Sequence, residues 1–265
     1  MYKGISFYFG YDIPIKERAR MIANVGFSSV ITNADKKLVC QNDRIEKQVK
    51  VFKEMGLHCS SLHMRYNRED LPHFFKKDKI GKKLEKNLKK DLKIARKYGF
   101  SCVVVHLAGE ISFEGVERFK RILNVAEKVR VPLALENLID LNPLFYFLDN
   151  FKSEYVKFCY DSGHNNAFNK EVDLLEKYGD RLVCVHLHDN DGKDDLHGLN
   201  RFGTIDWQDM AKKLAKTNLS CLDYELLPRS INGLSAQETL VEGMKQANEL
   251  EEMIMKEKAL LEKGV

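Results

Sequence analysis

Short runs of β-branched and aromatic residues alternate with longer amphipathic stretches along the whole chain. Eight such runs are predicted to be buried strands: residues 3–8, 27–32, 57–63, 101–106, 132–136, 156–161, 182–188 and 220–226. The stretches between them place apolar residues at helical spacing, as Leu84, Leu88 and Leu92 do. Several of these stretches end in a glycine just before the next run, which is typical of a helix C-terminus followed by a strand. Eight strands separated by helices predict a (β/α)8 barrel, the TIM-barrel fold.

The chain has 265 residues, a length that a single α/β barrel commonly occupies. No proline- or serine-rich linker and no change of composition divides it, so residues 1–265 are predicted to form one domain. A doubly wound sheet is the competing arrangement. It would usually contain fewer strands and a glycine-rich first turn, and residues 7–11 (Phe-Tyr-Phe-Gly-Tyr) do not supply such a turn.

Charge and hydropathy argue against several other classes of protein. Lysine and arginine number 43 and aspartate and glutamate 39, so the net charge of +4 disfavours a general polyanion binder. No run of about 18 apolar residues is present, so no transmembrane helix is predicted. The first residues lack the apolar region of a signal peptide, and we expect a cytoplasmic protein that binds no membrane. The six cysteines form no CxxC pair and are predicted to be buried, reduced thiols.

Two segments are predicted to be long helices. Residues 76–97 are rich in lysine and their leucines recur every four residues, so we expect one amphipathic helix with a solvated basic face rather than a nucleic-acid-binding patch. Residues 235–263 are predicted to form a long polar helix that covers the barrel wall, and a homo-oligomer formed through it is one hypothesis.

The carboxyl ends of the predicted strands carry residue types that bind divalent metals. In a barrel, ligands and catalytic groups lie at this end of the strands. Six consecutive strands carry such residues at or near their ends: His63, His106, Glu136, Asp161 with His164 just beyond it, His186 and Glu225. The loop after the seventh run adds Asp195 and His197, which lie on one side of an extended segment. Mixed imidazole and carboxylate donors suit Zn²⁺ or Mn²⁺, so the pattern predicts a metal site.

Four motifs resemble those of a known family: residues 135–137 (Leu-Glu-Asn), 161–164 (Asp-Ser-Gly-His), 186–190 (His-Leu-His-Asp-Asn) and 203–207 (Gly-Thr-Ile-Asp-Trp). On these residues the chain is similar to the xylose isomerase-like TIM barrels. That superfamily includes sugar phosphate isomerases and epimerases, together with the related endonuclease IV group of apurinic-site endonucleases. The resemblance extends over essentially the whole chain. Its motifs are specific for the superfamily and much less specific for the reaction.

The resemblance to the ketose 3-epimerases implies a metal quartet and a pair of acid/base glutamates. The quartet maps onto Glu136, Asp161, His186 and Glu225. On this hypothesis the ion chelates two substrate oxygens, Glu136 and Glu225 remove and return a proton on opposite sides of the sugar, and His164 binds a substrate oxygen. Asn142 stands where that branch has a glutamate and Gly192 where it has an arginine, which argues against ordinary ketose 3-epimerase activity.

The resemblance to endonuclease IV implies a larger set of donors, for three Zn²⁺ ions. All nine of its positions find a matching residue type: His63, His106, Glu136, Asp161, His164, His186, Asp195, His197 and Glu225. Tyr66, three residues after His63, also resembles that group's His-x-x-Tyr pattern. The implied chemistry is hydrolysis of a phosphodiester by a metal-activated water. Residues 189–206 carry five aspartates against one lysine and one arginine, so no basic belt for phosphates is predicted and nucleic acid is the less favoured partner.

Three functional hypotheses follow. The first is a metal-dependent isomerase or epimerase of a small carbohydrate, and the expected cofactor over all three hypotheses is one to three Zn²⁺ or Mn²⁺ ions per chain. The alternative is a Zn-dependent phosphodiesterase or apurinic-site endonuclease, and the third is a metal-loaded barrel that binds a small molecule without turnover. Substrate contacts are predicted for Tyr66, for His188, which alternates with His186 and shares its side of the strand, and for Trp207, for which packing is the alternative role.

Overall fold

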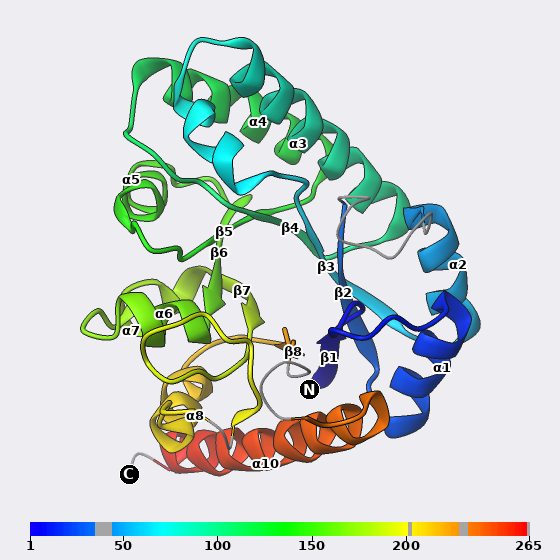
Figure 1. The fold of residues 1–265 in the computed structure, drawn as a ribbon. Coiled ribbons are helices and arrows are strands. Elements are labelled where there is room, and N and C mark those ends of the chain that lie inside the picture. Colours follow the sequence, from blue (N-terminus) through cyan, green and yellow to red (C-terminus); the bar gives the residue numbers. More distant parts are fainter. Residues whose placement is uncertain (35–43, 201–202, 228–232, 264–265) are drawn as a thin grey trace.

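Eight parallel strands form the centre of the structure, a computed structural model that describes residues 1–34, 44–200, 203–227 and 233–263 (Figure 1). The strands are β1 (Tyr2–Ser6), β2 (Ser29–Asn33), β3 (His58–His63), β4 (Cys102–Val105), β5 (Leu133–Glu136), β6 (Val156–Asp161), β7 (Leu182–His186) and β8 (Cys221–Tyr224). They are hydrogen-bonded in the order β7-β6-β5-β4-β3-β2-β1-β8, and each pairing is parallel.

The two outer strands of this order meet at a seam that closes the barrel. Leu187 and Tyr224 form a parallel bridge there. The N–H of Leu187 donates to the carbonyl of Asp223 at 2.8 Å, and the N–H of Glu225 donates to the carbonyl of Leu187 at 3.0 Å. The TIM-barrel prediction is therefore confirmed. Each predicted run overlaps a strand, although β1, β7 and β8 end two residues earlier than predicted.

The helices surround the strands (Figure 1). They are α1 (Ile15–Val25), α2 (Ile45–Glu54), α3 (Lys79–Tyr98), α4 (Phe113–Val129), α5 (Asn142–Asn150), α6 (Ser162–Phe168), α7 (Leu174–Tyr178), α8 (Trp207–Ala215) and α10 (Ala236–Glu262), with 3₁₀ turns η1 (Arg68–Phe75) and η2 (Gly179–Arg181). Gly26 and Gly99 follow α1 and α3 with φ of 111° and 81°, the left-handed conformation that ends a helix.

Both long helices predicted from the sequence are present. The lysine-rich helix α3 begins at Lys79 rather than at residue 76, because the Asp78 side chain accepts the N–H of Gly81 and caps the helix there. Helix α10 begins after Ser235, whose side chain forms a capping box with Glu238. It packs along α8 and α1 beside the barrel seam (Figure 1). In the described ranges, none of the helices combines the length and the apolar character needed to cross a bilayer.

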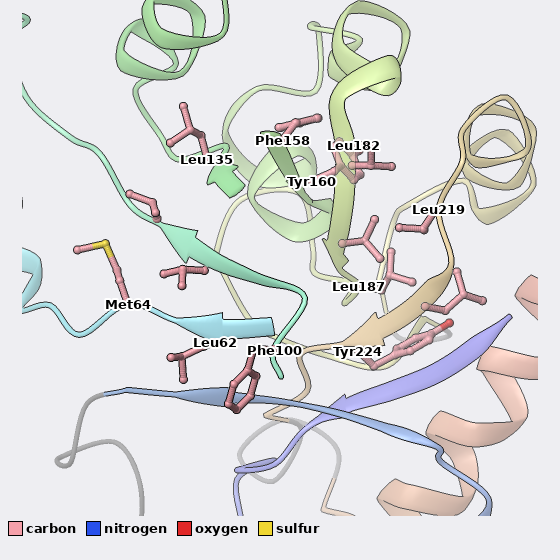
Figure 2. Close-up of a cluster of buried hydrophobic side chains, with 14 of the residues drawn as sticks. Leu62, Met64, Phe100, Leu135, Phe158, Tyr160, Leu182, Leu187, Leu219 and Tyr224 are labelled. Atoms are coloured by element: carbon pink, nitrogen blue, oxygen red, sulfur yellow. The ribbon is translucent and has the colours of Figure 1, made fainter. Parts of the chain in front are cut away.

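Large apolar side chains fill the space around the strands, as Figure 2 shows for Leu62, Leu135 and Phe158. The barrel interior is different, because its residues are small. Cys102, Val104, Ala134, Cys159 and Cys184 form a separate buried cluster there. Residues 134, 159 and 184 each lie two positions before a predicted metal ligand on the same strand and so share its face. This small-residue layer is the floor beneath the predicted site.

The cysteines agree with the prediction of buried thiols as far as the structure describes them. Cys59, Cys102, Cys159, Cys184 and Cys221 are free and buried. The sixth, Cys40, lies outside the described residues.

Candidate metal centre

All nine predicted donors converge at the carboxyl end of the barrel. They come from six neighbouring strand ends and from the loop after β7. In the part of the chain that the structure describes, the donor atoms form five groups, each with its atoms within 4.8 Å of one another: His63–His106–Glu136, Glu136–Asp161–His164, Asp161–His186–Glu225, Glu136–Cys159–His186 and, sharing no residue with these four, His188–Asp195–His197. His188 and Cys159 thus join the cluster, although the sequence predicted a substrate contact for the first and only burial for the second.

Glu136, the last residue of β5, lies at the centre of the cluster and is 4% exposed. Its Oε2 is 3.1 Å from Nε2 of His106, 3.2 Å from Nδ1 of His186 and 3.6 Å from Nε2 of His63. Oε2 of Glu136 and Nδ1 of His186 are buried atoms that form no hydrogen bond within the described residues. Buried polar atoms normally have hydrogen-bond partners, so this unsatisfied pair fits the ligands of a metal ion.

Main-chain carbonyl groups orient three of the imidazoles. The Nδ1–H of each donates to one carbonyl: His63 to Met64 at 3.1 Å, His164 to Asn137 at 3.0 Å and His197 to Glu225 at 2.9 Å. In the neutral ring this leaves Nε2 with its lone pair. Nε2 of His63 then faces Nε2 of His106 at 3.0 Å, and Nε2 of both His164 and His197 faces Oδ2 of Asp195 at 3.3 Å. Facing atoms at such distances share either a proton or a metal ion, and both imidazole nitrogens and carboxylate oxygens are metal ligands.

Electrostatics at the barrel seam also favour a cation. Oε2 of Glu225 lies 3.2 Å from Nδ1 of His186, so this nitrogen contacts two glutamates. Burial alone would lower the pKa of His186, but Glu225 and Glu136 raise it well above its ordinary value. Burial likewise opposes ionisation of Glu136 and Glu225, yet the neighbouring imidazoles hold the pKa of each carboxyl below its usual range. The carboxylates therefore attract positive charge to this point.

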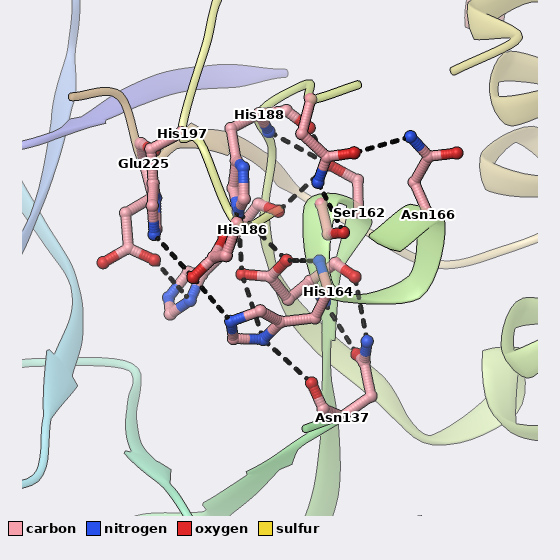
Figure 3. A network of polar contacts seen from close by, with 12 residues as sticks. Asn137, Ser162, His164, Asn166, His186, His188, His197 and Glu225 are labelled. Carbon is pink, nitrogen blue, oxygen red and sulfur yellow. Dashed lines mark hydrogen bonds and ion pairs between the residues drawn. The ribbon is translucent and has the colours of Figure 1, made fainter. Parts of the chain in front are cut away.

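Asn137 joins the end of β5 to that of β6 through Asp161, and Figure 3 shows Asn137 beside His164. The Asn137 amide donates to the carbonyl of Asp161 at 2.9 Å and accepts the Asp161 N–H at 2.8 Å. The Asp161 carboxylate accepts the N–H of His164 at 2.7 Å, which caps α6, and lies 3.0 Å from Nε2 of His188. A Cβ on Gly163 would lie 1.9 Å from the His188 ring. Asn137 was assigned no role from the sequence, although its place beside Glu136 in a motif was a signal.

The loop that carries Asp195 and His197 is folded around one buried carboxylate, Asp189. Its Oδ1 accepts three backbone N–H groups: Asn190 at 2.8 Å, Thr204 at 3.0 Å and Ile205 at 3.1 Å. Its Oδ2 accepts the indole N–H of Trp207 at 2.7 Å. A Cβ on Gly203 would lie 1.9 Å from Oδ1, so the turn needs glycine. Two of the sequence motifs thus meet at Asp189, a positioning role that the sequence analysis did not predict.

A cavity of about 350 Å³ opens beside the donors. Tyr66, His106, His164 and Asp195 line the side that belongs to the cluster. The ring centre of Tyr66 lies 4.6 Å from that of His106, which places the phenol between cluster and cavity. Trp207 is not among the residues that line this cavity, and its indole is engaged by Asp189. The substrate contacts of Tyr66, His188 and Trp207 stay predictions.

Comparison with known proteins identifies a family and a fold. A family model described as xylose isomerase-like TIM barrel matches residues 19–246. The uncharacterized protein y4fM of Sinorhizobium fredii is 27% identical over 249 aligned residues, which cover 78% of this chain and 79% of that protein.

Two solved structures are similar in fold over nearly their whole length. One is a D-psicose 3-epimerase with D-tagatose from Clostridium cellulolyticum, with a TM-score of 0.74, 16% identity, and coverage of 96% of this chain and 99% of that one. The other is the IOLI protein with a binding zinc atom, with a TM-score of 0.73, 14% identity, and coverage of 97% and 99%. At these identities the likeness is one of fold alone.

Proposed function

The chain belongs to the xylose isomerase-like TIM barrel family, and from this premise we propose that it is a metal-dependent isomerase or epimerase acting on a sugar derivative. One observation carries the proposal: the imidazoles of His63, His164 and His197 each donate Nδ1–H to a main-chain carbonyl and aim Nε2 at another donor. Such carbonyl-anchored histidines are characteristic of metal ligands. The similar fold of a ketose epimerase with D-tagatose supports a carbohydrate substrate.

The first ion would be held by Glu136, Asp161, His186 and Glu225. Their mixed imidazole and carboxylate donors fit Zn²⁺ or Mn²⁺. The fit rests on two buried atoms that lack hydrogen bonds in the described chain, Oε2 of Glu136 and Nδ1 of His186. When bound, an ion of this kind polarises a substrate carbonyl and acidifies the neighbouring C–H bond. The zinc atom of the IOLI structure supports this choice of metal.

Glu136 and Glu225 are the proposed acid/base pair. Both carboxylates contact Nδ1 of His186 at 3.2 Å, so they flank one point of the site, and in each turnover one acts as the carboxylate and the other as the carboxylic acid. One glutamate removes a proton from carbon and the other protonates the opposite face. The Glu225 side chain is 21% exposed and that of Glu136 is 1% exposed, so Glu225 exchanges its proton with water more readily. His164, which lines the cavity, would bind a substrate oxygen.

Deuterium uptake from D₂O tests this proposal. Protein loaded with Zn²⁺ or Mn²⁺ is incubated with a panel of ketoses and ketose phosphates, and incorporation is followed by mass spectrometry. We expect exchange at a carbon beside the carbonyl in at least one sugar, and a loss of at least about 100-fold in Glu136→Gln and in Glu225→Gln. Glu252→Gln, which alters an exposed glutamate of α10, is the matched control and should exchange normally. Absence of exchange in every sugar would contradict the proposal.

Phosphodiester hydrolysis is the second candidate, and one observation favours it. Asp195 lies 3.3 Å from Nε2 of both His164 and His197, which gives a group of donors beyond the quartet, as a multinuclear site requires. Against it, Arg68 is the one lysine or arginine among the described residues that line the cavity, so few contacts to phosphates are offered.

Metal content and strand cleavage separate the two candidates. Elemental analysis that gives one ion per chain favours the isomerase, whereas two or three ions favour the hydrolase. Nicking of a duplex with a single abasic site, at low salt and with Zn²⁺ present, would establish the second candidate. No nicking under these conditions would exclude apurinic-site cleavage.

A further inference from the structure

The cavity beside the metal donors has two chemically different walls. One wall consists of the donors His106, His164 and Asp195 with Tyr66. The other lining residues are apolar except for Arg68 and Asp140, and we call the apolar ones the second wall: Leu71, Pro72, Ala108, Leu138, Ile139 and Phe168. A neutral sugar has hydroxyl groups over most of its surface and would leave those groups without partners on this second wall. The difference between the two walls therefore constrains the chemical group that the substrate carries away from the metal donors.

The apolar wall is built by separate parts of the fold. Leu71 and Pro72 come from η1, Leu138 and Ile139 from the loop between β5 and α5, and Phe168 from the end of α6. Leu71 is buried, whereas the Ile139 side chain is 54% exposed. A large exposed apolar side chain at the edge of a ligand cavity is covered when an apolar ligand binds, and this burial supplies binding energy.

The charged residues of the cavity mark its solvent edge. Arg68 and Asp140 are exposed and belong to the same segments as the apolar wall. Asp140 accepts the N–H of Asn142 at 3.0 Å and so serves the start of α5. Neither charge lies in the buried part of the wall, which consequently offers an apolar surface.

We infer that the substrate carries an apolar group, of the size of an aromatic ring or a short branched hydrocarbon, opposite its metal-binding oxygens. This inference rests on the proposed function, because it takes the donor cluster as the point where two substrate oxygens are chelated. The apolar group then lies between Leu138, Ile139 and Phe168. A cavity of about 350 Å³ is at the small end of ligand sites, so the substrate is one sugar-sized unit with one such substituent.

A pair of hydroxamates tests the inference without knowledge of the substrate. Acetohydroxamate and benzohydroxamate both chelate Zn²⁺ through two oxygens and differ in a methyl against a phenyl group. Their dissociation constants are measured by calorimetry on the Zn²⁺-loaded protein and are normalised to their affinities for free Zn²⁺. We expect benzohydroxamate to bind at least about tenfold more tightly, because its ring is buried against the apolar wall.

Variants of the wall complete the test. Ile139→Asn changes an exposed side chain and Phe168→Ala a half-buried one. Each should weaken benzohydroxamate at least about threefold and leave acetohydroxamate unchanged. Phe113→Ala is the control, since Phe113 is 83% exposed and does not line the cavity.

The possible failures are distinguishable. Equal normalised affinities in the wild type, or a preference that survives both wall variants, would overturn the apolar-group inference and leave the metal site intact. If neither hydroxamate binds, the metal site of the proposed function fails, and the inference fails with it.

Discussion

Replacing Asp189 with asparagine tests whether one carboxylate holds the loop between β7 and α8 in place. Asparagine keeps one oxygen for the three backbone N–H groups but turns an amide N–H₂ toward the indole N–H of Trp207. A hydrogen bond to a charged group contributes about 1.5–3 kcal/mol, and that bond is lost outright. The other three become neutral bonds and weaken by about 0.5 kcal/mol each. We therefore expect Asp189→Asn to lower the free energy of unfolding by about 3–4.5 kcal/mol.

Urea unfolding of the metal-free protein measures this change, and calorimetry should show a Tm lower by about 6–18 °C for a chain of this size. Asp206→Asn is the matched control in the same loop. Asp206 accepts the N–H groups of Gln208 and Asp209 at 3.0 Å and caps α8, and asparagine caps a helix equally well. Its free energy of unfolding should stay within about 0.5 kcal/mol of the wild type.

Asp189→Asn should affect metal binding at the loop donors more than at the strand donors. Asp195 and His197 belong to the loop that Asp189 holds, whereas Glu136 and His186 lie on strands. Asp189→Asn should therefore weaken binding of any second ion and leave the first nearly unchanged. A free energy of unfolding within 1 kcal/mol of the wild type, or equal loss of all bound metal, would refute the reasoning.

Three further predictions concern other parts of the fold. Arg65 donates a hydrogen bond to Asp91, which is fully buried in α3. Arg65→Met should therefore lower the free energy of unfolding, measured in urea, by about 3–5 kcal/mol. Adding Asp91→Leu should restore most of that loss. Although burial opposes ionisation, arginine and lysine neighbours hold the pKa of Glu85 at about 2, below the ordinary 4.5. Glu85→Gln should therefore lower the free energy of unfolding by up to about 1 kcal/mol at pH 7. This difference in stability between variant and wild type should vanish as the pH falls from 4.5 toward 2. Gly163→Ala should displace His188, lowering both the Tm and the metal content by elemental analysis, and an unchanged metal content would count against the packing described.

The fold was predictable because its signal is local and repeated. Most strands are short, largely apolar runs between helical patterns, and glycines such as Gly26 and Gly99 mark the helix ends with positive φ. The nine candidate donors were predictable for a related reason: parallel strands bring their carboxyl ends to one face, so His63 and Glu136 lie 3.6 Å apart although 73 positions separate them in the sequence.

The supporting contacts could not be predicted in the same way. Asp189 lies among several aspartates of one loop, and nothing in its neighbours distinguishes the buried carboxylate from the exposed Asp191 and Asp194. Its role depends on the path of the chain between residues 190 and 205. Asp91 similarly looks like one more charge on a basic helix, because the Arg65 that pairs with it lies on another element.

The metal donors at the seam between β7 and β8 also bear on how the barrel opens. The barrel closes there through a single bridge, and His186 and Glu225 lie on its two sides. A cation bound by both residues would hold β7 and β8 together, because the strands could not separate without losing one of its ligands. Bound metal would then slow the first opening of the barrel. Removing the metal with a chelator should accelerate amide hydrogen exchange first at Leu187 and Glu225, whose N–H groups form the hydrogen bonds of the seam. The rate at which the seam opens would then determine how fast the metal-free protein unfolds.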